Sequence, residues 1–75
     1  MSEEKIGDRF LRKLYEKTVN DGTEGIEREE IGKEVGIIDV QIDKLVNELT
    51  YDGYIKKKGE SKICLTVDGR KRAEV

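Results

Sequence analysis

The clearest pattern of apolar and polar positions lies in the middle of the chain. Four branched apolar side chains recur there at the spacing i, i+3, i+4 and i+7, which places them on one face of a helix. They are Ile42, Leu45, Val46 and Leu49. Asp39 is a favourable N-cap residue, and Gly53 follows the last apolar position. The pattern predicts an amphipathic helix from about Asp39 to Asp52.

A shorter helical pattern precedes this one. Ile31 and Val35 stand four residues apart, and Gly36 supplies a backbone that can end a helix and turn the chain. We therefore predict a helix over about Glu27–Glu34. Gly32 within it is small enough to let the next helix approach closely. A short helix, a tight turn and a longer amphipathic helix together predict a helix-turn-helix.

The first part of the chain also has helical spacing, from about Ile6 to Val19. Its apolar stripe consists of Phe10, Leu11, Leu14, Tyr15, Thr18 and Val19. Residues 20–23, Asn-Asp-Gly-Thr, are typical of a turn and end the helix. Gly25 and Ile26 are predicted to form a very short extended segment, with Ile26 pointing into the core.

The last third changes to a period of two residues. Residues 54–58 and 62–65 are predicted strands, and the Gly-Glu-Ser between them is a hairpin tip. The alternation of residues 62–65 turns Cys64 away from the apolar side, so we expect it to be partly exposed. Thr66 can cap a last short helix over about residues 67–75. Gly69 lies in its first turn, where a large side chain would clash.

Composition limits the possible functions. The chain has 75 residues, of which 43% are charged and 35% hydrophobic, so we expect one domain with a small but periodic core. One cysteine and no histidine exclude an internal disulfide and argue against a zinc site. With no nucleophile–base pairing and no glycine-rich phosphate loop, we expect neither an enzyme nor a cofactor. No apolar run suits a signal peptide or a membrane span, and a reducing cytoplasmic location fits.

Three stretches resemble the winged helix-turn-helix superfamily, in particular small archaeal and bacterial regulators of the MarR type. EEIGKEVGI (residues 29–37) resembles the second helix and turn, and VQIDKLVNELTYDGYI (40–55) the recognition helix. LTVDGR (65–70) resembles the step after the wing. The resemblance implies a mainly α fold with a small antiparallel sheet (α+β), built as a three-helix bundle, a β-hairpin wing and a short C-terminal helix. One domain would cover residues 1–75, with the helix-turn-helix at about 27–52 and the wing at about 54–66.

The resemblance also implies the function of a small DNA-binding transcriptional regulator. In the family, the exposed face of the third helix enters the major groove and the wing contacts phosphates or the minor groove. By position, the bases would be approached by Gln41, Lys44 and Asn47, and the phosphates would be held by Arg28, Lys56, Lys57, Lys58 and Lys62. Asp39 and Asp43 depart from the family, which usually has small, polar or basic residues at these positions.

Local charge leaves a second function open. The net charge is −2 overall, yet residues 56–62 hold four lysines and one glutamate, a net +3. Residues 39–52 hold one lysine and four acids, a net −3. A basic wing favours double-stranded DNA, although lysines also guard edge strands against pairing. An acidic third helix favours a protein-interaction module with a basic partner. We expect a monomer or a weak homodimer, and we expect Tyr15, Tyr51 and Tyr54 at the core margin.

Overall fold

The computed structural model describes residues 5–21 and 25–74, and its elements follow the predicted order. They are α1 (Ile6–Asp21), β1 (Ile26–Glu27), α2 (Arg28–Val35), α3 (Asp39–Tyr51), β2 (Ile55–Lys58), β3 (Lys62–Leu65) and α4 (Val67–Glu74). Every predicted element is present, with ends that differ by one or two residues. Of the predicted turn at residues 20–23, Asn20 and Asp21 are instead the last residues of α1, while residues 22–23 and the last residue of the predicted final helix lie outside the described residues.

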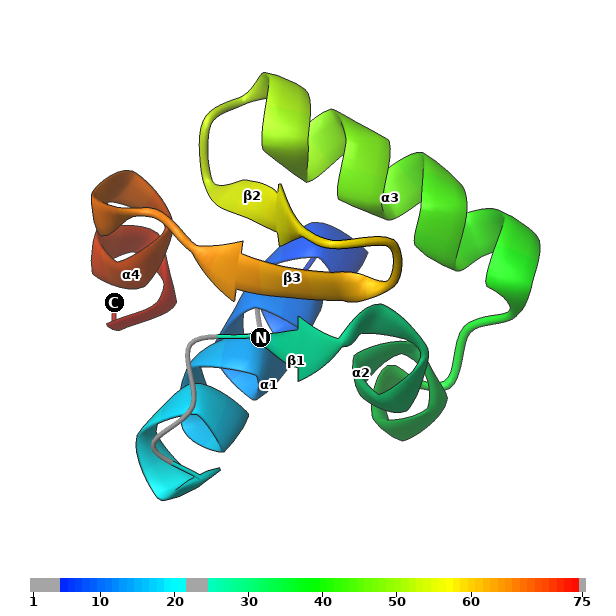
Figure 1. Cartoon of the computed structure of the whole chain (residues 1–75), viewed down its shortest axis with the longest axis horizontal. Helices are drawn as coiled ribbons and strands as arrows, with labels where there is room; N and C mark the ends of the chain where they lie inside the picture. Colours follow the sequence, from blue (N-terminus) through cyan, green and yellow to red (C-terminus); the bar gives the residue numbers. More distant parts are fainter. Residues whose placement is uncertain (1–4, 22–24, 75) are drawn as a thin grey trace.

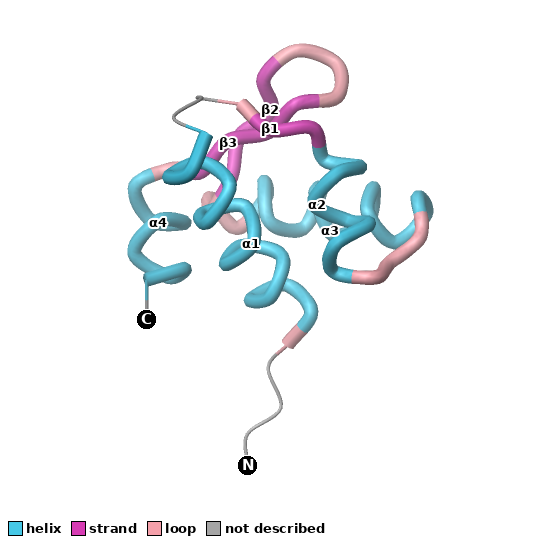
Figure 2. The backbone as a smooth tube through the Cα atoms, turned by 90° about the horizontal axis from the view of Figure 1, so that it is seen from below, coloured by secondary structure: helices cyan, strands magenta, loops and turns pink. Residues whose placement is uncertain are grey.

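The three strands form one antiparallel sheet in the order β1-β3-β2, and the helices lie on one side of it (Figure 2). Antiparallel pairing places Ile26 opposite Ile63 and Ile55 opposite Leu65. Side chains of directly opposed residues project to the same face of a sheet. These four apolar residues therefore define an inner face that covers the helices. The sheet has the predicted α+β character and closes the helical bundle on one side.

The core is the predicted one, with Phe10 at its centre. Phe10, Leu11, Leu14 and Ile31 have 0% of their surface exposed. The predicted stripe of α3 is buried against them, and Leu65, Tyr15 and Tyr54 pack at the margin as partly buried residues. Val19 does not belong to the core, since it is 54% exposed near the end of α1. Helix α1 therefore contributes its first three turns to the core rather than its full length.

The turn between α2 and α3 depends on two glycines. Gly36 has φ 91°, a left-handed conformation that L side chains rarely adopt, and its N–H donates to the carbonyl of Gly32 at 2.8 Å. A Cβ on Gly32 would lie 2.2 Å from Cδ1 of Ile42 on α3. The close approach of α3 to α2 that Gly32 predicted is therefore confirmed.

The start of α3 corrects one prediction. The N-cap is Ile38, with φ −93° and ψ 167°, and Asp39 is already helical. Isoleucine has no side-chain acceptor for the free N–H groups of the first turn. The contact that does form runs the other way, because Oε1 of Gln41 accepts a hydrogen bond from the N–H of Ile38 at 3.2 Å. The Asp39 carboxylate adds a negative charge at the positive end of the helix.

An ion-pair cluster joins α1 to α2. Nζ of Lys17 contacts the carboxylates of Glu34 and Glu30, the latter at 3.4 Å. Hydrogen bonding to Glu34, with a smaller effect of Glu30, raises the pKa of Lys17 above its ordinary value. Because the pKa is raised in the folded state, the stabilisation is present at neutral pH and is lost only as the pH rises through that raised pKa.

The junction of α4 with the rest of the domain is built around Thr66 and Gly69. Thr66 Oγ1 accepts from the N–H of Gly69 at 3.1 Å and caps α4, as predicted. The same hydroxyl donates to the carbonyl of Gly53 at 2.5 Å. The N–H of Thr66 donates to the carbonyl of Tyr54 at 3.0 Å. A Cβ on Gly69 would lie 1.8 Å from that Tyr54 oxygen, so α4 needs glycine at this position.

A pair of glycine substitutions tests this junction. Gly69→Ala should destabilise the fold by about 1 to 3 kcal/mol, because backbone must move to admit the methyl group. Gly7→Ala is the matched control. Its Cβ would meet only Cδ1 of Leu45 at 3.6 Å and Cδ2 of Leu49 at 3.8 Å, which are ordinary contacts. Since alanine favours a helix over glycine by up to about 1 kcal/mol, this variant should be neutral or stabilised. Equal denaturation midpoints for the two variants would contradict the packing described here.

Candidate nucleic-acid interface

The side of α3 that faces away from the core carries four residues at the spacing i, i+4, i+7 and i+11. We call them the crest: Val40, Lys44, Asn47 and Tyr51. With 100° of rotation per residue, they point directly opposite the buried stripe. Val40 is 74% exposed and Tyr51 is 91% exposed, and both polar members are exposed as well. The crest therefore presents one positive charge, one amide, one phenol and one apolar group, and no carboxylate.

The acidic residues of α3 lie on its flanks. Asp43 flanks the crest on the side of the hairpin, where its Oδ1 lies 3.0 Å from a guanidinium nitrogen of Arg28. Arg28 is positioned at the tip of the hairpin, because its backbone N–H donates to the carbonyl of Ser61 at 3.0 Å. The pair leaves little net charge on that flank. Glu48 lies on the opposite flank, beside a small hollow lined also by Ile6 and Ile37.

The hairpin of β2 and β3 lies alongside α3 (Figure 1). Its register divides the four wing lysines between two faces of the sheet. Lys57 is opposite Ile63 and so projects from the inner face, next to α3. Its Nζ donates a hydrogen bond to Oδ1 of Asn47 at 3.0 Å. One side chain of the wing is thereby joined to the crest.

The other three wing lysines project from the outer face of the sheet. Lys56 is opposite Cys64, and Lys58 is directly opposite Lys62. Like charges at directly opposed positions of an antiparallel pair are destabilising. On its other side, Lys62 is opposite Glu27 of β1, so one carboxylate lies beside the lysines of this face.

A hollow of about 340 Å³ lies on the outer face of the sheet, and Cys64 is one of the residues that line it. The prediction that Cys64 is partly exposed is wrong. Cys64 does face away from Ile63, as its place in the strand requires, but it is buried, with 8% of its surface exposed. It belongs to β3, the central strand, and longer neighbouring side chains cover it. Lys56, Lys58 and Arg70 are the charged residues around it. The prediction that Cys64 forms no functional disulfide stays a prediction.

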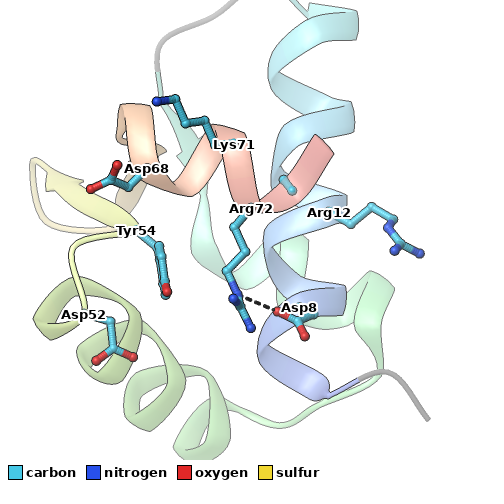
Figure 3. A pocket seen from close by; sticks show the side chains of 8 residues that line it. Asp8, Arg12, Asp52, Tyr54, Asp68, Lys71 and Arg72 are labelled. Atoms are coloured by element: carbon cyan, nitrogen blue, oxygen red, sulfur yellow. Dashed lines mark hydrogen bonds and ion pairs between the residues drawn. The ribbon is translucent and has the colours of Figure 1, made fainter. Parts of the chain in front are cut away.

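A second hollow, of about 640 Å³, lies between the start of α1, the end of α3 and α4 (Figure 3). Arg72 extends into it from α4, with Nε 3.0 Å from Oδ1 of Asp8 and its guanidinium 5.4 Å from the ring centre of Tyr54. Asp52, Asp68 and Lys71 also line it. Its charges are of mixed sign, and its central cation is already paired. We interpret this hollow as the seam that holds α4 against α1 and the turn after α3.

The predicted site residues thus divide into three groups. Lys44 and Asn47 lie on the crest, and Asn47 meets Lys57 of the wing. Lys56, Lys58 and Lys62 share the outer face of the hairpin. Arg28 is paired with Asp43, and Gln41 is used in the N-terminal turn of α3. The structure joins the first group to the wing through Lys57, places the second group on the opposite face of the hairpin, and gives the third a local structural contact.

Two crest residues were missed by the sequence reasoning. Val40 was overlooked because it is apolar, and Tyr51 was assigned to the core margin, which its 91% exposure shows to be wrong. Helical spacing from Lys44 and Asn47 would have found both, since all four residues follow one stripe. Tyr15 and Tyr54 are at the core margin as predicted.

Other kinds of site were sought in the described part of the chain. Within residues 5–21 and 25–74, no group of three or more histidine, cysteine or acidic residues is arranged to hold a metal ion. No helix in these ranges has the length and apolar character needed to cross a bilayer.

Comparison with known proteins agrees with this architecture. No protein-family model and no curated protein sequence matches the chain. Among solved structures, it is similar to the crystal structure of a MarR-family transcriptional regulator from Silicibacter pomeroyi, with a TM-score of 0.64 and 17% sequence identity. The alignment covers 89% of this chain and 47% of that regulator, so the chain spans about half of the regulator's length. The likeness confirms that the chain adopts a winged-helix fold of the MarR type.

Proposed function

We propose that this winged-helix domain binds double-stranded DNA as part of transcriptional regulation, with the crest of α3 in the major groove and the wing on the phosphates. The observation that carries the proposal is the placement of charge. The crest of α3 carries no carboxylate, and the basic hairpin lies directly beside it, joined to it by the hydrogen bond from Lys57 to Asn47. The fold neighbour is itself described as a transcriptional regulator.

Each crest residue suits a base edge. An α-helix fits the major groove, which is about 12 Å wide. Lys44 can donate to the O6 and N7 acceptors of guanine, and the methyl groups of Val40 can contact the C5-methyl of thymine. Gln41 lies to one side and reaches bases only if it leaves the N–H of Ile38. The crest would therefore supply direct readout, mainly through Lys44 and Asn47.

The wing would supply most of the sequence-independent affinity. Lys56 is opposite Cys64 and Lys58 is opposite Lys62, while Lys62 is also opposite Glu27 of β1. Arg28 adds to this effect indirectly, because its ion pair offsets the carboxylate of Asp43 on α3. Phosphate contacts of this kind position a protein on the duplex, while the crest would select the sequence.

A charge reversal on the crest tests the proposal. Lys44→Glu should weaken binding to a cognate duplex by at least about tenfold, because one base contact is worth about 1 to 3 kcal/mol and the new carboxylate faces the groove. Lys71→Glu is the matched control. It changes the net charge equally, but its residue lies on α4 beside the hollow of Figure 3. Fluorescence anisotropy with a labelled duplex measures both. An equal loss for the two variants would contradict the assignment of the crest.

A second function is favoured by one feature of α3. Ile38 is 67% exposed and Val40 is 74% exposed beside Asp39, so the start of the helix presents an apolar and acidic edge that suits a basic protein partner. Asp43→Ser separates the two functions. In a DNA-binding domain it should strengthen non-specific binding, because it removes a carboxylate and frees Arg28. In a partner-binding module it should weaken the protein complex, and DNA binding should be negligible throughout.

We also propose that the chain is a monomer or a weak homodimer and that it acts in the cytoplasm. Among the described residues, the exposed large apolar side chains are distributed over both ends of α1, over α3 and over α4. Such a distribution does not form the single large apolar face of an obligate dimer. Sedimentation at several protein concentrations would test the assembly state.

A further inference from the structure

The contact between Lys57 and Asn47 constrains what Asn47 can recognise. We propose that Lys57 is a positioning residue that turns the side-chain amide of Asn47 so that its NH2 group faces the DNA, and that this domain therefore selects a base with a keto oxygen, guanine or thymine, at that position. This inference rests on the proposed function. It names the chemical class of base that the crest reads, which the fold alone does not determine.

The orientation of the amide follows from the chemistry of the two groups. A lysine ammonium has three N–H donors and no acceptor. Only the carbonyl oxygen of Asn47 can therefore face Nζ of Lys57, at the observed distance of 3.0 Å. Exchanging the amide oxygen and nitrogen would place donors against donors. The NH2 group is left on the other side of the amide, with both of its N–H donors available.

The register of the hairpin explains why this lysine alone makes the contact. Lys57 is opposite Ile63 and projects toward α3, whereas Lys56 and Lys58 are opposite Cys64 and Lys62 and project from the other face. Because side chains alternate between the two faces of a strand, neighbouring lysines of identical chemistry project from opposite faces and make different contacts. This provides a control on the same strand, one residue away.

The constraint changes the base that Asn47 should prefer. An unconstrained asparagine pairs with adenine through two bonds, accepting from N6 and donating to N7. With one lone pair of its oxygen taken by Lys57 and an ammonium group beside that oxygen, Asn47 presents its NH2 donors to a base more readily than its acceptor. These donors suit O6 and N7 of guanine or O4 of thymine. The amino groups of adenine and cytosine would instead leave donors facing donors in a desolvated interface, which is unfavourable.

The hydrogen bond is exposed in the free protein. In a complex, the duplex would exclude water from the groove and from the contact beneath it. A charge-assisted hydrogen bond is stronger at lower local dielectric. Binding would therefore tighten the constraint at the moment when the base is read.

Selection from a library of duplexes tests the proposal. The parent, Asn47→Ala, Lys57→Met and Lys56→Met are each carried through selection and sequencing, and affinities for the selected duplexes are then measured. In the parent, the position that loses its preference in Asn47→Ala should favour guanine or thymine over adenine by about tenfold. Lys57→Met should reduce this preference below about twofold or shift it to adenine, because Asn47 regains its acceptor. Lys56→Met should keep the preference, and both lysine variants should lose overall affinity by similar factors.

Failure of the inference and failure of the proposed function give different results. The inference is overturned if the parent favours adenine at the Asn47-dependent position, or if Lys57→Met keeps the parent preference there. Unchanged preferences at the other positions in Lys57→Met would show that the variant still folds and docks correctly. If the parent selects no duplex at low salt, the proposed function fails, and the inference falls with it.

Discussion

Replacing Phe10 by alanine is expected to remove about 3 to 5 kcal/mol from the free energy of unfolding. Phe10 has 0% of its surface exposed and belongs to the buried cluster that includes residues of α1, α2, α3 and the sheet. Its removal would leave a cavity that the helices cannot close. A small domain has about 5 to 15 kcal/mol of total stability, so the variant should be largely unfolded or close to it at 37 °C. Chemical denaturation followed by circular dichroism measures the change.

Tyr51→Ala is the matched control, since it also truncates an aromatic side chain. Tyr51 is 91% exposed on the crest, so its removal should change stability by no more than about 0.5 kcal/mol. The two variants separate burial from residue type. A Phe10→Ala protein as stable as Tyr51→Ala would mean that the core is not where the structure places it.

Replacing Lys56, Lys57 and Lys58 together by alanine is expected to have the largest effect on DNA binding. Each neutralised phosphate contributes about 0.9 to the slope of log affinity against log salt concentration. Because Lys57 is engaged with Asn47, the triple variant loses the phosphate contacts of Lys56 and Lys58, so it should flatten that slope by roughly 2 and weaken binding to all sequences. The loss of the Lys57 contact to Asn47 should also reduce sequence preference, which a purely electrostatic wing would not do.

A control of equal charge belongs beside it. Lys5, Arg9 and Lys71 are exposed on or next to α1 and on α4, outside the crest and the wing. Replacing these three by alanine changes the net charge by the same amount. The salt slope should then change by less than about 1, because few or no phosphate contacts are lost. Equal flattening by the two triple variants would assign the salt dependence to overall charge rather than to the wing.

Periodicity was sufficient for most of the fold. The stripe of α3 and Ile63 are buried as predicted, whereas the rest of the alternation in β3 is not, since Cys64 is buried and Leu65 is only partly buried. Glycines also indicated where elements turn or pack closely. Gly36 has a left-handed backbone conformation, and a Cβ at Gly32 or Gly69 would meet a neighbouring element. The prediction failed for the exposure of Cys64, which depends on elements that are close in space but not in sequence. Cys64 is buried because β3 became the central strand of the sheet, and the pairing order of strands is not written in the spacing of one strand.

The candidate site was less accessible to sequence reasoning. The count of charges over residues 39–52 predicted an acidic helix. Because the residues of a helix are distributed around its axis, one face can differ from the total, and the crest contains none of the acidic residues. Arg28 and Asp43 are distant in the sequence. Their pairing depends on how α2, α3 and the hairpin pack together, which the sequence around either residue does not show. The same holds for Lys57 and Asn47, ten residues apart on different elements. Local sequence indicated the residue types, and tertiary packing determined which of them meet.

The central claim is that the crest of α3 and the wing form one DNA-binding surface. Amide chemical shifts in the 15N-labelled chain, followed while a double-stranded DNA is added at low salt, test it most directly. The account predicts the largest changes at Val40, Lys44, Asn47 and Tyr51 and across residues 56–62, with little change over Val67–Glu74 of α4. An unchanged spectrum at low salt, or changes centred on α4 and the hollow beside it, would contradict the account.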